Sequence, residues 1–252
     1  MEVVTMASRK GGVTKTATAK TLGAGLLRKG YSVLFVDLDS QANLTYGLGA
    51  KEGGISSMDL LTGEATAQEA IQNTTKGDVI AGAEALDSAD MIITGKGKEY
   101  RLRDALKAVA NLYDYCIIDT PTALGTLTIN ALAAADSLII PVQADTDSLK
   151  GLGQLSKTLE AVKKYCNPNL YIRGILITRY DTRTIFTRDM RANFDAAADM
   201  LGTKLFSTPI RECIRMKEAQ DLQTDIFSYD AKCNAAVDYG IFINEFLKTE
   251  KE

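Results

Sequence analysis

The feature that most constrains this chain is the stretch from residue 3 to residue 17, VVTMASRKGGVTKTA. It predicts a short apolar strand, a glycine-containing turn, and a helix that runs to about Lys29 and stops at Gly30. Backbone N–H groups of such a turn and of a helix N-terminus point at one centre, where the helix dipole adds partial positive charge. The stretch therefore predicts a binding site for a polyphosphate.

The residues of the turn and of the first helical turn have the chemistry that this site needs. Gly11 and Gly12 let phosphate oxygens approach the backbone closely. Lys15 would place a positive charge on the β- and γ-phosphates, and the Thr16 hydroxyl would be a ligand to Mg²⁺. The alternative for the same residues is a solvated loop followed by an ordinary glycine turn.

Residues 10 to 16, KGGVTKT, do not fit the general phosphate-loop pattern G-x-x-x-x-G-K-[ST], but they fit the variant K-G-G-x-x-K-[ST] in full. In this they resemble the deviant Walker A motif of the ParA/MinD family of dimeric ATPases. The resemblance implies that Lys10 reaches across a dimer to the nucleotide of the other subunit, so that Lys10 and Lys15 are both catalytic. The implied nucleotide-binding residues are Lys10, Gly11, Gly12, Val13, Thr14, Lys15, Thr16 and Ala17.

One residue departs from the family pattern. Most relatives carry glycine where this chain has Thr14, and a β-branched residue is strained where the backbone needs a positive φ. We expect ATP binding to survive with a slightly altered loop.

Two further strands are predicted to end in carboxylates. Residues 32 to 39 form an apolar run that ends in Asp37 and Asp39, and residues 114 to 119 form another that ends in Asp119. Ligands bind at the carboxyl ends of parallel strands, so we expect these acids to face the phosphate loop. Because Asp37 and Asp39 lie at alternate positions, we expect them to have different roles.

The run DLDSQANLT from residue 37 resembles the second nucleotide motif of the family, with Ser40 in place of the usual proline. By this resemblance Asp39 is catalytic and positions or activates the attacking water, while Asp37 lies near the metal. Asp119 takes the place of the Walker B aspartate that holds Mg²⁺ through water. The predicted metal-site residues are Thr16, Asp37 and Asp119.

Strands that alternate with helices along the chain predict an α/β fold with one doubly wound, mostly parallel sheet. The expected architecture is a single P-loop ATPase domain over residues 1–252, a P-loop NTPase with a deviant Walker A motif. Further strands are predicted at residues 78–80, 137–143, 170–178 and 204–210, and helices at 56–61, 66–72, 100–112, 147–164, 188–201 and 230–247.

The composition limits which catalytic groups the chain can use and which cellular location we expect. The chain has no histidine, so catalysis must use Asp, Lys, Thr and backbone groups, which suffice for phosphoryl transfer. Four cysteines occur singly and predict neither a disulfide framework nor a zinc site: Cys116, Cys166, Cys213 and Cys233. Neither a signal peptide nor a membrane span is evident, so we expect a cytoplasmic protein.

The net charge of the chain is −3, but residues 170 to 217 contain nine Lys or Arg against five Asp or Glu. Such a basic segment is typical of binding to the nucleic-acid backbone without sequence readout. Arg188 and Arg191 would share a helix face, and Arg215 resembles a family arginine linked to non-specific DNA binding. The predicted DNA-binding residues are Arg188, Arg191, Arg215 and Lys217, with scattered solvated charges as the alternative.

The resemblance covers nearly the whole chain and implies an ATP-hydrolysing molecular switch. ATP and Mg²⁺ would close a sandwich homodimer that binds DNA non-specifically, and slow hydrolysis would open it. The implied task is the segregation of a plasmid, mobile element or chromosome origin on the nucleoid, with a ParB-like centromere-binding partner and no membrane.

Other functions for a chain with this phosphate loop fit the sequence less well. A MinD-like membrane-positioning ATPase needs a basic amphipathic C-terminal helix, and residues 242–252 show no lipid-facing extension. An iron–sulfur carrier needs paired cysteines, and a metabolic P-loop enzyme has no use for Lys10. A nucleotide-insensitive DNA-binding or adaptor protein is the alternative if Thr14 or Ser40 spoils the phosphate geometry.

Overall fold

The computed structural model describes residues 1–51 and 53–248 of the chain. Within them seven strands form one sheet in the order β3-β4-β2-β5-β1-β6-β7. Every neighbouring pair is parallel except β3 and β4, which are antiparallel. The strands are β1 (Glu2–Met6), β2 (Val33–Asp37), β3 (Ile71–Thr74), β4 (Gly77–Ile80), β5 (Tyr115–Asp119), β6 (Ser137–Gln143) and β7 (Tyr171–Thr178).

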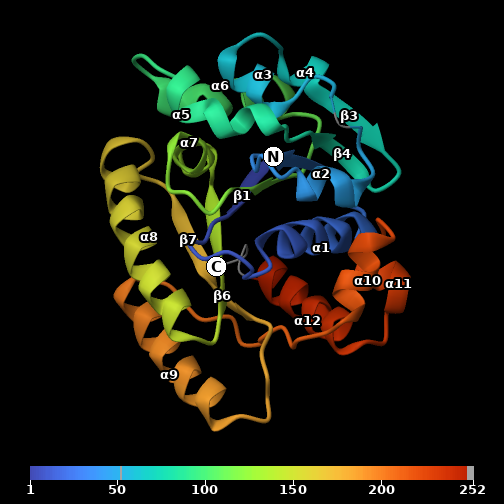
Figure 1. The fold of residues 1–252 in the computed structure, drawn as a ribbon, viewed down its shortest axis with the longest axis vertical. Coiled ribbons are helices and arrows are strands. Elements are labelled where there is room, and N and C mark those ends of the chain that lie inside the picture. The colour runs from blue at the N-terminus through green and yellow to red at the C-terminus, as the bar shows by residue number, and fades with distance from the viewer. Residues whose placement is uncertain (52, 249–252) are drawn as a thin grey trace.

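Helices cover both faces of the sheet, which confirms the doubly wound α/β fold (Figure 1). The α-helices are α1 (Lys15–Arg28), α2 (Asn43–Leu48), α3 (Ser57–Thr62), α4 (Ala67–Ala70), α5 (Ala89–Ile92), α6 (Arg101–Leu106), α7 (Thr126–Ala134), α8 (Thr146–Tyr165), α9 (Ile185–Met200), α10 (Arg215–Asp221), α11 (Ile226–Asp230) and α12 (Asn234–Lys248). Short 3-10 helices are η1 (Glu84–Ser88), η2 (Lys98–Tyr100) and η3 (Lys107–Val109). None of the described helices combines the length and the apolar character that crossing a bilayer requires.

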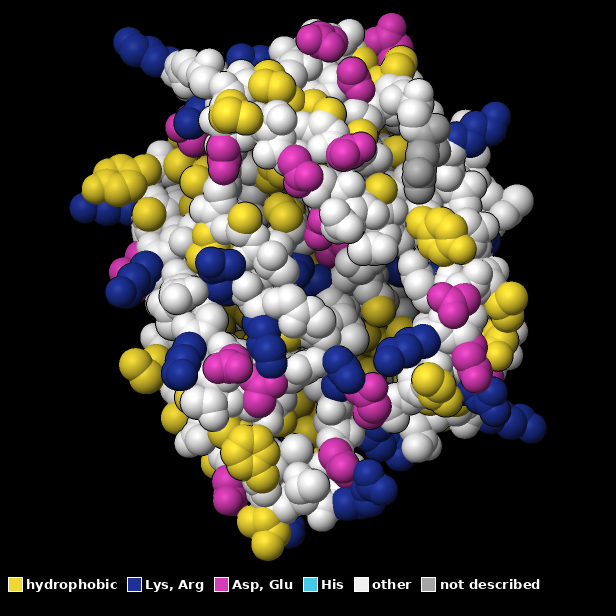
Figure 2. All heavy atoms as spheres, viewed as in Figure 1, with side chains coloured by type: hydrophobic (Ala, Val, Ile, Leu, Met, Phe, Trp, Pro, Cys, Tyr) yellow, Lys and Arg dark blue, Asp and Glu magenta, His cyan; other side chains and the backbone are white. Residues whose placement is uncertain are grey.

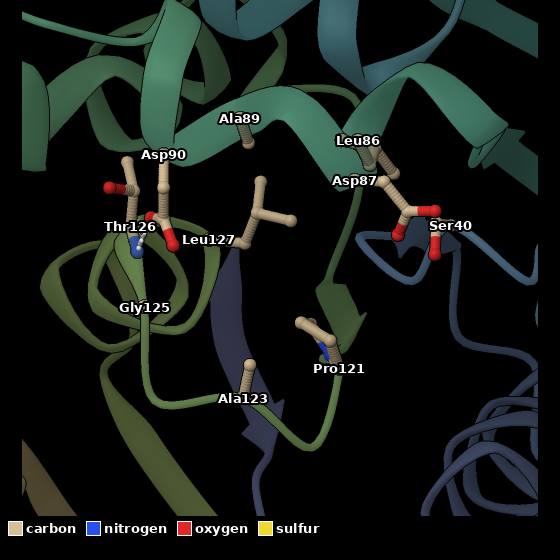
Figure 3. A pocket seen from close by; sticks show the side chains of 10 residues that line it. All are labelled: Ser40, Leu86, Asp87, Ala89, Asp90, Pro121, Ala123, Gly125, Thr126 and Leu127. Atoms are coloured by element: carbon tan, nitrogen blue, oxygen red, sulfur yellow. Dashed lines mark hydrogen bonds between the residues drawn. The ribbon is translucent and has the colours of Figure 1, made fainter.

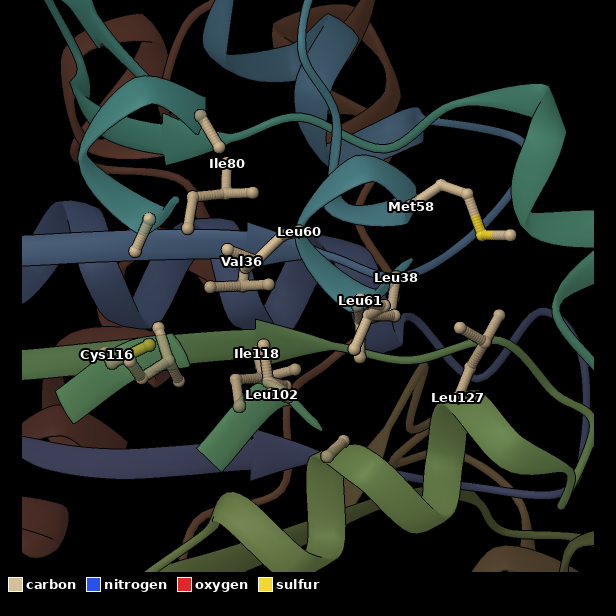
Figure 4. Packing of buried hydrophobic residues seen from close by; sticks show 14 of the residues in the cluster. Val36, Leu38, Met58, Leu60, Leu61, Ile80, Leu102, Cys116, Ile118 and Leu127 are labelled. Carbon is tan, nitrogen blue, oxygen red and sulfur yellow. The ribbon is translucent and has the colours of Figure 1, made fainter. Parts of the chain in front are cut away.

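Strand β2 shows how the sheet is buried on both sides. Its residues Leu34 and Val36 pack with side chains of α3, α6 and α7, and Figure 4 shows Val36 beside Ile118 of β5 in this cluster. The alternate residues Val33 and Phe35 pack with α1 and α12 on the other face. All five residues of β2 are buried, as expected of a central strand in a parallel sheet.

The prediction of a last strand at residues 204–210 is wrong. This segment runs along the outer edge of β7, where it forms an isolated bridge between Leu205 and Ile175 and, further on, a backbone hydrogen bond from Ile210 to Ile177 at 2.8 Å. The Ser207 N–H donates instead to the Glu245 carboxylate of α12, at 3.1 Å, and Pro209 has no N–H to donate. Pairing with β7 is therefore interrupted.

Two predicted helices are shorter than their apolar pattern indicates. The helix expected at residues 66–72 ends at Ala70, and Ile71 begins the antiparallel edge strand β3. The helix expected at residues 100–112 is divided into η2, α6 and η3. In both segments apolar spacing over one or two turns does not determine where the helix ends.

Candidate nucleotide-binding site

A cavity of about 630 Å³ opens where β1, β2, β5 and β7 reach their carboxyl ends. Its walls come from distant parts of the chain. One wall is the phosphate loop and the segment after β2, including Thr16 and Asp39. The other wall is the segment from Ile210 to Asp221 together with Tyr239 of α12.

The phosphate loop has the backbone conformation that the sequence made us expect. Gly12 and Thr14 both have positive φ, at 76° and 59°, and the Thr14 carbonyl accepts the first helical hydrogen bond of α1 from the Thr18 N–H, at 2.8 Å. Thr14 is thus a β-branched residue in the left-handed region, which costs about 1–3 kcal/mol. The strained turn aims the N-terminus of α1 at the cavity.

Other strained backbone conformations also lie around the cavity. Besides Thr14, two non-glycine residues nearby have positive φ: Ala42, at 49°, in the loop after Asp39, and Arg179, at 50°, at the end of β7. Arg179 itself lines the cavity. Backbone strain persists where the surrounding structure enforces it, and it is concentrated at functional sites.

Lys15 is buried beneath the loop, with 7% of its surface exposed. Burial lowers the pKa of its ammonium group, while the negative charges of Asp119 and Asp39 oppose that shift. The three side chains therefore lie close enough to interact electrostatically, so the structure brings together residues from three separate sequence motifs.

Asp119 ends β5 in an environment that disfavours a bare carboxylate. Burial raises the pKa of Asp119 to about 8, and the charge of Asp37 adds to the shift. Among the described residues neither Asp119 oxygen has a hydrogen-bond partner of ordinary geometry, although the Thr16 hydroxyl and the Lys15 ammonium partly oppose the shift. A fully buried carboxylate of this kind fits a site for a cation.

The neighbouring Asp37 has a different environment. Its carboxylate accepts from the Thr45 N–H at 2.9 Å, the Thr45 hydroxyl at 2.8 Å and the Asp39 N–H at 3.1 Å. These bonds tie the end of β2 to α2 and to the following loop. Asp37 thus positions the segment that carries Asp39, which itself lines the cavity.

The donor set suits Mg²⁺. The described residues contain no group of three or more His, Cys, Asp or Glu side chains placed around one point. Mg²⁺ does not need such a cage, because it is commonly held by one or two carboxylates, water and substrate phosphates. Asp119 and the Thr16 hydroxyl would hold it here, with Asp37 behind them.

Lys10 lies outside the cavity and is bound within its own subunit. Its ammonium forms an ion pair with Asp145 and donates to the Gln143 side chain at 3.2 Å. Asp145 also caps α8 by accepting from the Ser148 N–H. No local sequence pattern indicates the contact of Asp145 with Lys10, which lies 135 residues away.

The predicted DNA-binding residues fall into two groups. Arg188 and Arg191 lie on α9, whereas Arg215 and Lys217 lie on α10, and α12 lies between these helices in Figure 1. Arg215 is paired with Glu218 at 2.8 Å. Lys217 lines the nucleotide cavity.

The basic segment 170–217 is less positive than its composition indicates. Six of its nine basic side chains form ion pairs with acidic ones: Arg173, Arg179, Arg183, Lys204, Arg211 and Arg215. Figure 2 shows Lys and Arg in a band across the lower half of one face, with acidic side chains among them. This pairing is not visible in the charges of the segment alone, since several of the acids come from outside it: Glu2, Glu218, Asp238 and Glu245.

A smaller cavity, of about 110 Å³, lies beside the loops that follow β2 and β5 (Figure 3). Ser40 and Pro121 line it together with Leu127 of α7. Asp90 of α5 accepts from the Thr126 N–H at 2.7 Å and so caps α7 from another element. Ser40, where the family pattern has proline, therefore lines a small cavity together with Leu86 and Asp87 of η1.

The sequence relationships agree with this geometry. A family model described as an AAA domain matches residues 1–172. The chain is 37% identical over 243 residues to the sporulation initiation inhibitor protein Soj of Bacillus subtilis (strain 168), covering 94% of this chain and 95% of that protein.

The chain belongs to the ParA/MinD family.

Two further similarities fit membership of the ParA/MinD family. The chromosome partitioning protein ParA of Caulobacter vibrioides (strain NA1000 / CB15N) is 35% identical over 263 residues, covering 100% of this chain and 96% of that protein. A crystal structure named cobyrinic acid a,c-diamide synthase from Mycobacterium smegmatis, with bound ATP analog and magnesium, superposes with a TM-score of 0.86. It is 32% identical and covers 100% of this chain and 96% of that one.

Within this ParA/MinD fold, the part of the site that sequence reasoning missed is the C-terminal wall of the cavity. Ile210, Cys213 and Met216 carry no phosphate chemistry and form no motif of their own. Only the fold shows that this segment lies opposite the phosphate loop.

Proposed function

We propose that the chain binds and hydrolyses ATP with Mg²⁺ in the cavity between the phosphate loop and α10. The observation that carries this proposal is the Asp119 carboxylate, fully buried next to Lys15 and Thr16 and without an ordinary hydrogen-bond partner among the described residues. The ATP analog and magnesium named for the Mycobacterium smegmatis structure support it.

Each residue of the site has a distinct role in the proposed reaction. The N–H groups of residues 12 to 16 bind the phosphates, and Lys15 adds positive charge where the γ-phosphate separates. Asp39 orients the attacking water, while Asp37 holds its segment through Thr45. Bound Mg²⁺ would neutralise phosphate charge, held by Thr16 and Asp119.

The proposed active form is a sandwich homodimer. Lys10 does not line its own cavity, and an ammonium group that leaves Asp145 is available to the nucleotide of a second copy. Slow basal turnover follows, because the set of catalytic groups is completed only on dimerisation.

The proposed task is the partition of a plasmid, mobile element or chromosome origin, which the name of the Caulobacter vibrioides relative, chromosome partitioning protein ParA, supports. The dimer would bind DNA non-specifically on the nucleoid, in the cytoplasm, and a ParB-like protein would stimulate hydrolysis. Arg188, Arg191 and Lys217, which have no ion pair among the described residues, are the first candidates for phosphate contacts. The tail residues 249–252, which bear on a membrane-binding alternative, lie outside the described residues.

A DNA retention assay tests the whole proposal. DNA is incubated with the protein and ATP, ADP or no nucleotide, at two salt concentrations, beside the variant Lys10→Ala. We expect retention only with ATP, loss of retention in the variant, and weakening by salt. A parallel phosphate-release assay reports hydrolysis.

The outcomes separate the alternatives. Equal DNA binding in all nucleotide states would support a nucleotide-insensitive adaptor and contradict the switch. Hydrolysis without DNA binding in any state would favour a membrane-positioning or metabolic relative.

A further inference from the structure

Two of the four cysteines meet at the C-terminal wall of the cavity. Cys213 lines the cavity just before α10, and Cys233 stands just before α12. Cys233 packs on the same apolar cluster as Met216 of α10, whose N–H donates to the Cys213 carbonyl at 3.2 Å. The two side chains interact without a hydrogen bond of ordinary geometry, and burial, with a contribution from Cys213, raises the pKa of the Cys233 thiol. Sequence spacing gave no hint of this contact, because 19 residues that form α10, α11 and their loops separate the two cysteines.

The backbone around the pair is held in a fixed register. Arg211, two residues before Cys213, donates to the Asp238 carboxylate of α12 from its backbone N–H at 3.0 Å and from its guanidinium at 2.8 and 2.7 Å. The Cys233 sulfur accepts from the Ala236 N–H at 3.4 Å and so caps the first turn of α12. These contacts place the segment with Cys213 against the start of α12.

The other two cysteines have no such arrangement. Cys116 is fully buried in β5. Cys166 is partly exposed at the end of α8, on another element. Cys213 and Cys233 are both partly exposed, so an oxidant in solution can reach them.

We propose that Cys213 and Cys233 form an oxidisable dithiol, a modification site whose disulfide fixes the C-terminal wall of the nucleotide cavity. The Cys213 thiolate attacks a peroxide, which forms an S–O bond and releases hydroxide as the O–O bond breaks. The Cys233 thiol then loses its proton and attacks the sulfenic sulfur, the S–S bond forms, the S–O bond breaks, and the hydroxyl group leaves with that proton as water. In total two thiols and one hydrogen peroxide give one disulfide and two waters.

The disulfide would change the cavity as well as the chain. It closes a covalent ring that contains α10 and α11, and it ties Cys213, which lines the cavity, to the residue before α12. Conversely, a ligand that fills the cavity covers Cys213. Nucleotide binding and oxidation are therefore coupled in both directions, and this part of the inference rests on the proposed function.

Peptide mapping tests the pair directly. The full chain is treated with hydrogen peroxide, alkylated, digested with trypsin without reductant and analysed by mass spectrometry. Cleavage at the flanking Lys and Arg leaves Cys213 in the peptide ECIR and Cys233 in CNAAVDYGIFINEFLK. We expect these two peptides to be linked in a monomer, separated by reductant, and unlinked in Cys213→Ser and Cys233→Ser. Cys166→Ser, the control variant, should keep the link.

A second arm tests the coupling to the cavity. The non-hydrolysable ATP analogue AMPPNP with Mg²⁺ should slow formation of the link about fivefold or more, and leave oxidation of Cys166 unchanged. A melting-temperature shift measured on the same sample reports whether AMPPNP binds.

Each outcome decides on one part of the proposal. Oxidation of Cys166 with no 213–233 link, or a link only between two chains, overturns the proposal. A link that forms equally fast with bound AMPPNP overturns its coupling to the cavity. No binding of AMPPNP counts against the proposed function, while the linked peptide, which needs no nucleotide, still decides on the pair.

Discussion

At the scale of single residues, Thr14 is where side chain and backbone conflict most directly. Its φ of 59° suits glycine, and its buried hydroxyl has no hydrogen-bond partner of ordinary geometry among the described residues, although it interacts with the Tyr239 hydroxyl. The side chain therefore adds strain and a poorly satisfied polar atom to a loop that the fold must hold in place.

The substitution Thr14→Gly should raise the free energy of unfolding by about 0.5–1 kcal/mol, since relief of strain exceeds the added freedom of the unfolded chain. Urea unfolding followed by circular dichroism measures it. Val13→Gly is the matched control and should destabilise, because Val13 is fully buried. A loss of stability in Thr14→Gly would show that the threonine packs favourably despite its backbone.

Substitution of Asp119 should raise the stability of the chain and impair its function. Without metal at pH 8, Asp119→Asn should stabilise the chain by about 1–3 kcal/mol, because a buried carboxylate without a good partner is removed. The same variant should lose the dependence of nucleotide binding on Mg²⁺. Thermal melts with and without Mg²⁺ and nucleotide measure both effects. A destabilised variant whose nucleotide binding still depends on Mg²⁺ would contradict this role of Asp119.

Lys20 should make the folding stability of the chain depend on pH. It is buried in α1, where its ammonium donates to the Gln220 side chain at 3.0 Å. Burial, with a contribution from Lys76, lowers the pKa of Lys20 from 10.5 to about 8. Between these values the unfolded chain binds more protons than the folded one, so stability rises with pH, and the full cost of burying the charge is present below pH 8.

The variant Lys20→Met should therefore be more stable than the parent at pH 7, by about 1–2 kcal/mol after loss of the hydrogen bond. The difference should shrink as the pH approaches 10.5. Denaturant unfolding at several pH values measures it, with the exposed Lys29→Met as control. An advantage that grows with pH would contradict the cause assigned to Lys20.

At the scale of helices and strands, the elements that carry the site were predictable and the edge elements were not. Strands β1, β2 and β5 are buried on both sides, so their apolar runs identify them. Edge strand β3 is half exposed and its sequence also suits the end of a helix. Its assignment depends on pairing with β4, which is a tertiary contact that local pattern does not contain.

Some residues of the site were likewise predictable from local sequence, and others were not. The phosphate loop and the acids after β2 and β5 are local motifs at the ends of strong strands, and the structure brings Lys15, Asp39 and Asp119 together as expected. The contact of Lys10 with Asp145 joins residues 135 apart, and the ion pairs of the basic segment recruit distant acids. Such contacts depend on the fold as a whole.

Helix α1 packs so closely on the sheet that one of its glycines is obligatory. A Cβ at Gly23 would lie 2.2 Å from the ring of Phe35, which is fully buried in β2. Gly23→Ala should cost about 1–3 kcal/mol of unfolding free energy. Gly153 of α8 has open space around its Cβ position, so Gly153→Ala should instead add about 0.5–1 kcal/mol.

Chemical denaturation of the two alanine variants measures this difference. Equal effects would mean that helix propensity, rather than contact with Phe35, decides the outcome at Gly23.

At the scale of the whole molecule, the contact between Lys10 and Asp145 competes with the proposed dimer. Asp145→Asn removes the opposite charge but keeps a residue that caps α8 well. With AMPPNP and Mg²⁺ the variant should dimerise at about fivefold lower protein concentration, since each subunit releases a partly exposed ion pair.

Sedimentation velocity over a range of concentrations measures this shift, with Asp147→Asn on the exposed side of the same helix as control. Weaker dimerisation of Asp145→Asn would mean that the aspartate helps to hold Lys10 in the dimer.

The two walls of the nucleotide cavity are synthesised at different stages of translation. One wall consists of the phosphate loop and of the segment after β2 with Asp39 and Asn43, and the other begins at Ile210 and includes Tyr239. A chain emerging from the ribosome completes its phosphate loop early, yet the opposite wall is still unsynthesised for most of translation. The cavity exists only in a chain extended at least to Tyr239, so a prematurely released fragment cannot compete with the complete protein for the ligand of that cavity.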